Sequence, residues 1–244
     1  MRWHAVVWKI SANKHKRSSQ TMTTVFIARR GAQRTRASQA HLEAARELNV
    51  LGTADTLYRA QAALPGLNPD TLLIDLRLED GAALSLVRTL RERQADRPKV
   101  MLVAEDASDP LLFATLRAGA DAYLLEADLP IAASLLRRMS AGEASMAAPL
   151  ALQILQFFNE QSALPKTLAP VNERALDWHT HGANPMRLSP GECRLVQALA
   201  QGARAGEIAA RMALSVEGLG RRLGNIYRKL SWDVRSGSLS LLAA

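Results

Sequence analysis

A run of helix start and stop signals in the last quarter of the chain, residues 188–242, constrains its fold more than any other feature. Ser189 can accept hydrogen bonds from the first free N–H groups of a helix, and Pro190 suits the first helical position. Glu192 stands where the carboxylate of a capping box reaches back to the cap, and Gly202 can end the helix. The sequence therefore predicts a short helix between Ser189 and Gly202.

Two more helices are predicted behind the first, over residues 204–212 and from the cap Ser215 to about Leu230. At 100° per residue, the third helix separates into an apolar arc and an opposite polar arc. The apolar side chains are Leu219, Leu223, Ile226, Tyr227 and Leu230. The opposite face carries Glu217, Arg221, Gly224, Asn225 and Arg228, with Arg222 and Lys229 on its flanks.

Two helices joined by a tight turn, the second of them basic, can place side chains in the major groove of DNA. Arginine and asparagine can read base edges there, and lysine and arginine can contact phosphates. The third helix alone also fits an ordinary solvated amphipathic helix, but the capped three-helix pattern favours double-stranded DNA as a partner. The expected DNA-binding residues are Ser215, Glu217, Arg221, Arg222, Asn225, Arg228 and Lys229.

This part of the chain resembles the LuxR/NarL-type helix-turn-helix domain over about fifty-five residues. The matching residues are Leu188-Ser189-Pro190-Gly191-Glu192, Gly202, Glu207-Ile208-Ala209, Leu214-Ser215 and Asn225-Ile226-Tyr227-Arg228-Lys229-Leu230. The resemblance implies that the third helix enters the major groove and that a fourth, residues 234–242, helps to form a homodimer. Glu217 and Gly218 depart from the Lys or Thr common in the family. Gly218, Gly220 and Gly224 each weaken the helix by about 1 kcal/mol relative to alanine.

The charge of the chain is concentrated at its two ends. Residues 1–20 hold five basic side chains and no acidic one, and residues 186–244 hold nine basic and four acidic ones. Residues 21–141 hold fifteen of each sign and are neutral. The basic excess thus coincides with the expected DNA-binding domain, where attraction to a polyanion needs it.

Apolar runs too short for a membrane and a single cysteine, Cys193, favour a cytoplasmic protein with no membrane partner. We expect a disordered basic extension over residues 1–21, with a DNA-touching arm as the alternative. A receiver-like domain follows over 22–141, then a linker with one helix over 142–185 and the helix-turn-helix domain over 186–244.

Between Thr24 and Ala141, short apolar runs alternate with amphipathic stretches, which predicts an α/β fold with a five-stranded, doubly wound parallel sheet. The expected strands are 25–28, 50–52, 72–74, 100–103 and 122–125. The expected helices are 38–48, 54–64, 81–93, 110–118 and a last one that ends at Met139. Such sheets bind ligands at the carboxyl ends of their strands.

Residues 68–81 and 118–125 resemble the third strand with its following loop, and the fifth-strand region, of a two-component receiver domain. The resemblance places Asp75 at the phospho-acceptor position. The other positions of that site have degenerated: Arg29 and Arg30 stand in place of the acidic pair, Val103 in place of the Thr, and Glu126 in place of the Lys. Because Mg²⁺ needs several oxygen ligands, we expect no phosphorylation and no metal, with a guanidinium paired to Asp75 instead.

Other functions remain open. A dinucleotide-dependent enzyme lacks its glycine motif, because Arg29-Arg30-Gly31-Ala32 follows the first strand. No Ser/His/Asp grouping is apparent, and His179 and His181 lack a third metal ligand, so we expect neither an enzyme nor a cofactor. An adaptor that dimerises but binds DNA weakly or not at all is one alternative. A regulator whose receiver-like domain takes a partner protein or a small ligand is another.

Overall fold

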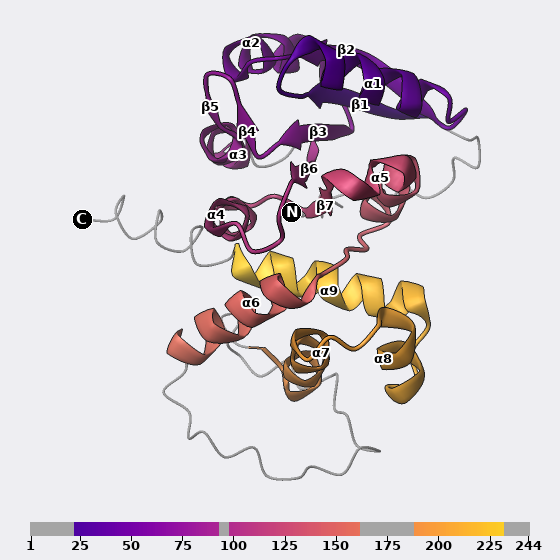
Figure 1. Cartoon of the computed structure of the whole chain (residues 1–244), viewed down its shortest axis with the longest axis vertical. Helices are drawn as coiled ribbons and strands as arrows, with labels where there is room; N and C mark the ends of the chain where they lie inside the picture. Colours follow the sequence, from indigo (N-terminus) through magenta and orange to yellow (C-terminus); the bar gives the residue numbers. More distant parts are fainter. Residues whose placement is uncertain (1–21, 93–97, 162–187, 232–244) are drawn as a thin grey trace, which may run out of the picture.

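The computed structural model describes residues 22–92, 98–161 and 188–231. Its first part is a five-stranded parallel sheet in the order β2-β1-β3-β6-β7 (Figure 1). The strands are β1 (Thr23–Ala28), β2 (Leu48–Ala54), β3 (Thr71–Asp75), β6 (Lys99–Ala104) and β7 (Ala122–Leu125). This order, in which the chain reverses its direction of winding after β2, is that of the flavodoxin-like sheet. The predicted fold class is confirmed.

Helices cover both faces of the sheet, as the strand sequences require. In β1, Val25 and Ile27 face one apolar cluster, while Phe26 and Ala28 face the other, because successive side chains of a strand point to opposite sides. α1 (Ala32–Glu43) and α5 (Ala132–Ser140) cover the first face. The second face is covered by α2 (Leu57–Leu67), α3 (Ala83–Glu92) and α4 (Pro110–Ala118).

Several details of this part differ from the sequence prediction. The helix expected over 54–64 is α2, which begins three residues later because Ala54 belongs to β2 and Thr56 caps the helix. The helix expected over 38–48 is α1, which begins six residues earlier because the chain turns at Gly31, where φ is 81°. Leu48 instead opens β2 and pairs with Thr23. A small antiparallel hairpin of β4 (Arg77–Leu78) and β5 (Gly81–Ala82) was also not predicted.

The second part is helical and contains α6 (Ala148–Gln161), α7 (Pro190–Ala200), α8 (Ala205–Arg211) and α9 (Val216–Leu230). The predicted capping box closes around Ser189 and Glu192 at the start of α7. α6 is the one helix expected within the linker 142–185. It packs against α7, and its Leu150 and Ile154 belong to the apolar cluster that also contains Leu195 and Leu199 of α7. The fourth helix expected over 234–242 and the extension 1–21 lie outside the described residues.

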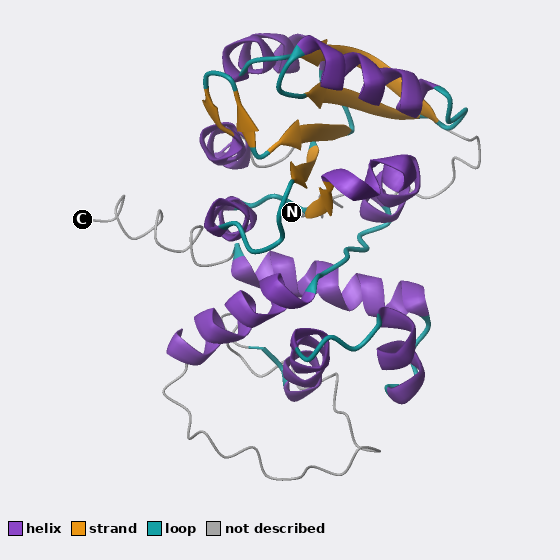
Figure 2. Ribbon diagram, in the orientation of Figure 1, coloured by secondary structure: helices purple, strands orange, loops and turns teal. Residues whose placement is uncertain are grey.

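α9 runs between the sheet part and the pair α7 and α8, as Figures 1 and 2 show. One continuous apolar cluster extends from the α2–α3–α4 face of the sheet into the helical part. A 3-10 helix, η1 (Glu126–Ile131), joins β7 to α5. Among the described helices none is long and apolar enough to cross a membrane.

Candidate functional site

The first candidate site lies at the carboxyl ends of β1, β3, β6 and β7, where this sheet class binds ligands. Asp75 is the last residue of β3 and pairs in register with Val103 of β6. Arg29 follows β1 directly, and Glu126 follows β7. Parallel pairing therefore brings together four positions that are up to about a hundred residues apart in the sequence.

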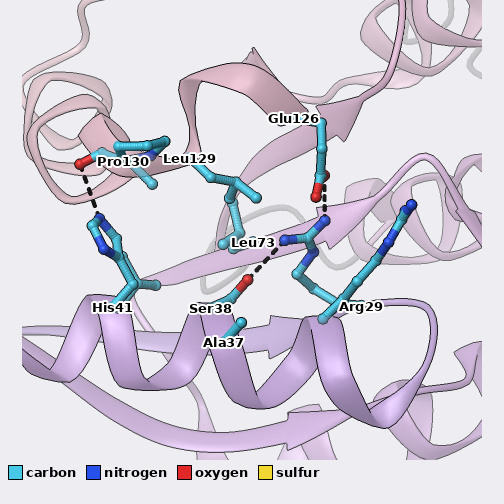
Figure 3. A pocket seen from close by; sticks show the side chains of 11 residues that line it. Arg29, Ala37, Ser38, His41, Leu73, Glu126, Leu129 and Pro130 are labelled. Atoms are coloured by element: carbon cyan, nitrogen blue, oxygen red, sulfur yellow. Dashed lines mark hydrogen bonds and ion pairs between the residues drawn. The ribbon is translucent and has the colours of Figure 1, made fainter.

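Arg29 is the centre of this site. Its side chain is only 1% exposed, and its Nε donates to Oδ1 of Asp75 over 2.9 Å. Nη1 donates to Oγ of Ser38 over 2.7 Å, and Nη2 forms an ion pair with Glu126 (Figure 3). The guanidinium thus has an acceptor from three separate elements, β3, α1 and η1, which fix it in one orientation.

Arg30 contributes to the site through its backbone. Its N–H donates to Oδ2 of Asp75 over 2.8 Å. Its side chain is half exposed and lies 3.9 Å from the carboxylate of Glu105. Because neighbouring residues along an extended chain point to opposite sides, only Arg29 faces inward, and the expected pair between a guanidinium and Asp75 forms through it.

The charges of the site are reversed relative to the receiver pattern. One guanidinium, Arg29, stands between two carboxylates, Asp75 and Glu126. Burial raises the pKa of the Asp75 carboxyl, whereas the nearby Arg29 charge and the two hydrogen bonds oppose that rise. Both oxygens of Asp75 are occupied by donors.

The residues around Asp75 do not fit a Mg²⁺ ion. A cation that prefers six oxygen ligands would have to stand next to the Arg29 guanidinium, and Val103 offers no hydroxyl group. The nearby acidic residues are engaged elsewhere: Asp80 accepts from the first N–H groups of α2, Glu105 pairs with Arg34, and Asp106 accepts from Ser108. The described residues contain no group of three or more potential ligands that could hold a metal.

The second candidate site is α9, the expected recognition helix. Ser215 caps it, accepting from the N–H of Gly218 over 3.0 Å. The five predicted apolar residues are all buried: Leu219, Leu223, Ile226, Tyr227 and Leu230. On the opposite side, Glu217, Arg221, Asn225 and Arg228 are exposed, and the guanidinium of Arg228 donates a hydrogen bond to Oδ1 of Asn225.

Lys229, expected at a phosphate, has an internal partner. Its Nζ lies 2.6 Å from Oε2 of Glu192, the buried carboxylate that also accepts from the N–H of Ser189 in the capping box. The lysine therefore helps to hold α9 against α7. This contact joins residues from two helices, so the angular analysis of α9 alone did not reveal it.

A different role also emerges for two of the three glycines of α9. Gly220 and Gly224 face the connection between α5 and α6 rather than solvent, and the O atom of Gly220 accepts from the N–H of Ala144 over 2.9 Å. A Cβ atom on Gly224 would clash with the carbonyl oxygen of Gly142, and one on Gly220 would lie 3.1 Å from the Cβ of Glu143. At position 224, only glycine permits this close approach of backbones.

Two tyrosines complete this contact between the parts. The hydroxyl of Tyr227 donates to the O atom of Ser145 over 2.5 Å, and the N–H of Ala147 donates to the hydroxyl of Tyr123 over 2.7 Å. Burial raises the pKa of Tyr123 to about 12. We call residues 142–145 together with α9 the docking contact. Sequence reasoning missed this contact, and its only visible signal was three glycines in one otherwise regular helix.

Comparisons with known proteins place these two sites in context. No protein-family model matches the chain. Over 80 residues the chain is 35% identical to the DNA-binding transcriptional activator DevR/DosR of Mycobacterium tuberculosis (strain ATCC 25618 / H37Rv). The matched stretch covers 33% of this chain and 36% of that protein, so the chain spans only about a third of its relative's length.

Solved structures of response regulators are among the matches, with low sequence identity and TM-scores below 0.5. The RcsB response regulator of Salmonella typhimurium is 17% identical with a TM-score of 0.48, over 85% of this chain and 91% of that chain. An RcsB–DNA complex is 16% identical with a TM-score of 0.49, over 88% and 99%. The non-phosphorylated receiver domain of RcsB from Escherichia coli is 19% identical with a TM-score of 0.45, over 50% and 95%.

Proposed function

We propose that this chain is a DNA-binding transcriptional regulator that works without phosphorylation of Asp75. The observation that carries the proposal is the buried Arg29 guanidinium bound to Asp75. The guanidinium occupies the space that Mg²⁺ would need and pairs with the negative charge that would attract the ion. The carboxylate oxygens already accept hydrogen bonds from Arg29 and Arg30. Asp75 then acts as a structural tie between β3 and the end of β1 rather than as a nucleophile.

The DNA-binding part of the proposal rests on α9. Its exposed Arg221, Asn225 and Arg228 have the chemistry that reads base edges. The surrounding residues 186–244 carry nine basic and four acidic side chains, a net charge of +5, which favours a polyanion. The relative DevR/DosR is itself a DNA-binding transcriptional activator.

The docking contact supplies a control on this activity. Gly220 and Gly224 face residues 142–145, and Gly224 shares an arc of the helix with Glu217 and Arg228. A helix in the major groove is enclosed by DNA over its groove-facing side, so a duplex cannot reach the Gly220–Gly224 side of α9 while residues 142–145 cover it. We therefore infer that the docked form binds DNA weakly and that α9 must be released for tight binding.

The adaptor alternative drew its support from Glu217 and from the three glycines of α9. Gly220 and Gly224 pack against residues 142–145. This packing explains why glycine stands at both positions without any loss of DNA binding. Glu217 is exposed at the first turn of α9, where a carboxylate also favours the positive end of the helix dipole.

A gel-shift experiment with genomic fragments at low and high salt tests DNA binding. We expect specific binding that falls steeply with salt and that is lost in the double variant Arg221→Ala plus Arg228→Ala. The matched control is Arg59→Ala, which removes an exposed arginine of α2 in the sheet part and leaves binding unchanged. Specific binding that survives the double variant would refute this assignment, and no binding at any salt would favour the adaptor.

A further inference from the structure

A cavity of about 200 Å³ lies between α1 and η1, next to the Arg29–Glu126 ion pair (Figure 3). Leu73 and Leu129 lie in the middle of the close-up, between α1 below and η1 above. Other apolar walls come from Ala37 and Leu42 of α1 and from Ala132 of α5. The cavity is therefore mostly apolar, with a polar end at Arg29 and Ser38.

The volume of the cavity limits the size of the ligand that it can hold. An apolar cavity of about 150 Å³ in another protein holds one benzene molecule. A cavity of about 200 Å³ therefore has room for a six-membered ring and about two or three further non-hydrogen atoms. It is too small for a nucleotide.

One buried donor at the polar end is unused. Ser38 is only 4% exposed, and its Oγ accepts from Nη1 of Arg29. No residue that the structure describes accepts the proton of this hydroxyl group. A buried donor without an acceptor costs free energy, so an acceptor oxygen on a ligand beside Ser38 would be favoured.

The positive charges beside the cavity are already paired with carboxylates. Arg29 contacts Asp75 and Glu126, and Arg34 pairs with Glu105. An anionic ligand would compete with these carboxylates, whereas a neutral ligand would not. We propose that this cavity binds a small, neutral aromatic compound that carries one acceptor oxygen, such as an aryl ketone.

The position of the cavity links it to α9. Ala132, the first residue of α5, lines the cavity, and Arg138 near the other end of the same helix pairs with Glu143 over 3.0 Å. Glu143 is the residue that Gly220 of α9 approaches. A ligand that shifts α5 would therefore change the docking contact. This link rests on the proposed function, whereas the binding of the ligand does not.

Binding is tested on the full chain without DNA, by following its ¹H–¹⁵N spectrum during titration with three probes. Acetophenone should bind with a Kd of about 0.1–1 mM, as its size allows. Ethylbenzene, which lacks the oxygen, should bind about threefold to tenfold more weakly, and benzoate should not bind. No binding of acetophenone, or tighter binding of benzoate, would overturn the proposal.

Three variants locate the site. Ala37→Phe places a ring at the mouth of the cavity and should abolish binding, whereas Ala40→Phe, an equally exposed position of α1 outside the lining, should not. Ser38→Ala should make acetophenone and ethylbenzene bind equally. Equal binding to the Ala37 and Ala40 variants would contradict the assigned cavity. If acetophenone binds as expected but leaves the affinity for DNA unchanged, the link through α5 is wrong and the binding site stands.

Discussion

At the scale of single residues, the Arg29–Asp75 pair determines what the receiver-like site can do. In a pocket of clustered carboxylates, removing one acid relieves repulsion between like charges. Here the reverse is expected, because Asp75→Ala leaves the buried Arg29 guanidinium with Glu126 as its one remaining carboxylate. We expect Asp75→Ala to lower the free energy of unfolding by about 3 kcal/mol, the lower end of the cost of breaking a buried pair.

Urea unfolding followed by circular dichroism measures this change. The matched control is Asp55→Ala, which breaks the exposed pair with Arg59 and should cost at most about 1 kcal/mol. A variant at Asp75 that is as stable as the parent, or more stable, would contradict the structural role given to this carboxylate.

Sequence reasoning reached part of this site. The pair between a guanidinium and Asp75 follows from strand order, because β1 and β3 are neighbours and Arg29 and Asp75 lie at the same ends. The contribution of Ser38 did not follow, since that serine was taken as the start of a helix and instead lies inside α1 beneath Arg29. The spacing of apolar residues along the sequence does not show which side chains of different elements lie close enough to contact one another.

At the scale of elements, α9 combines a predicted face with an unpredicted one. Alanine has a higher helix propensity than glycine, so Gly224→Ala taken alone would stabilise the helix by about 1 kcal/mol. The Cβ atom of the new alanine, however, would collide with the carbonyl oxygen of Gly142. We expect the collision to open the docking contact and to tighten DNA binding by at least about fivefold, because the binding-competent fraction rises.

Fluorescence anisotropy with labelled DNA, together with small-angle scattering of the free protein, tests this expectation. Gly206→Ala is the control, because a Cβ atom on Gly206 of α8 would meet nothing within 4 Å. It should change neither the radius of gyration nor the affinity. An unchanged radius and affinity in the Gly224 variant would show that the contact does not restrain α9.

The elements themselves were largely predictable. α4 and β7 have the predicted bounds, Pro110–Ala118 and Ala122–Leu125, because Asp109 and Pro110 mark the start of the helix and Gly119 its end. The predicted bounds of α1 were shifted toward the C-terminus, because neither its start after Gly31 nor its weakly apolar face gave a clear signal in the sequence.

At the scale of the whole molecule, the contact between α9 and residues 142–145 could not be predicted, because it depends on backbone approach at Gly220 and Gly224. The oligomeric state stays a prediction. We expect a dimer, since one helix-turn-helix buries little surface on DNA and two half-sites are usually needed. Light scattering at micromolar concentration checks this, and a monomer with and without DNA would contradict it.

The central claim is that the receiver-like part acts without aspartyl phosphorylation, because Arg29 occupies the place next to Asp75 that Mg²⁺ would need. Incubation with acetyl phosphate and Mg²⁺, followed by intact-mass measurement and a DNA-binding assay on the same sample, tests it most directly. We predict no phosphoryl adduct and no change in DNA affinity. A stable adduct on Asp75 accompanied by tighter DNA binding would contradict the account.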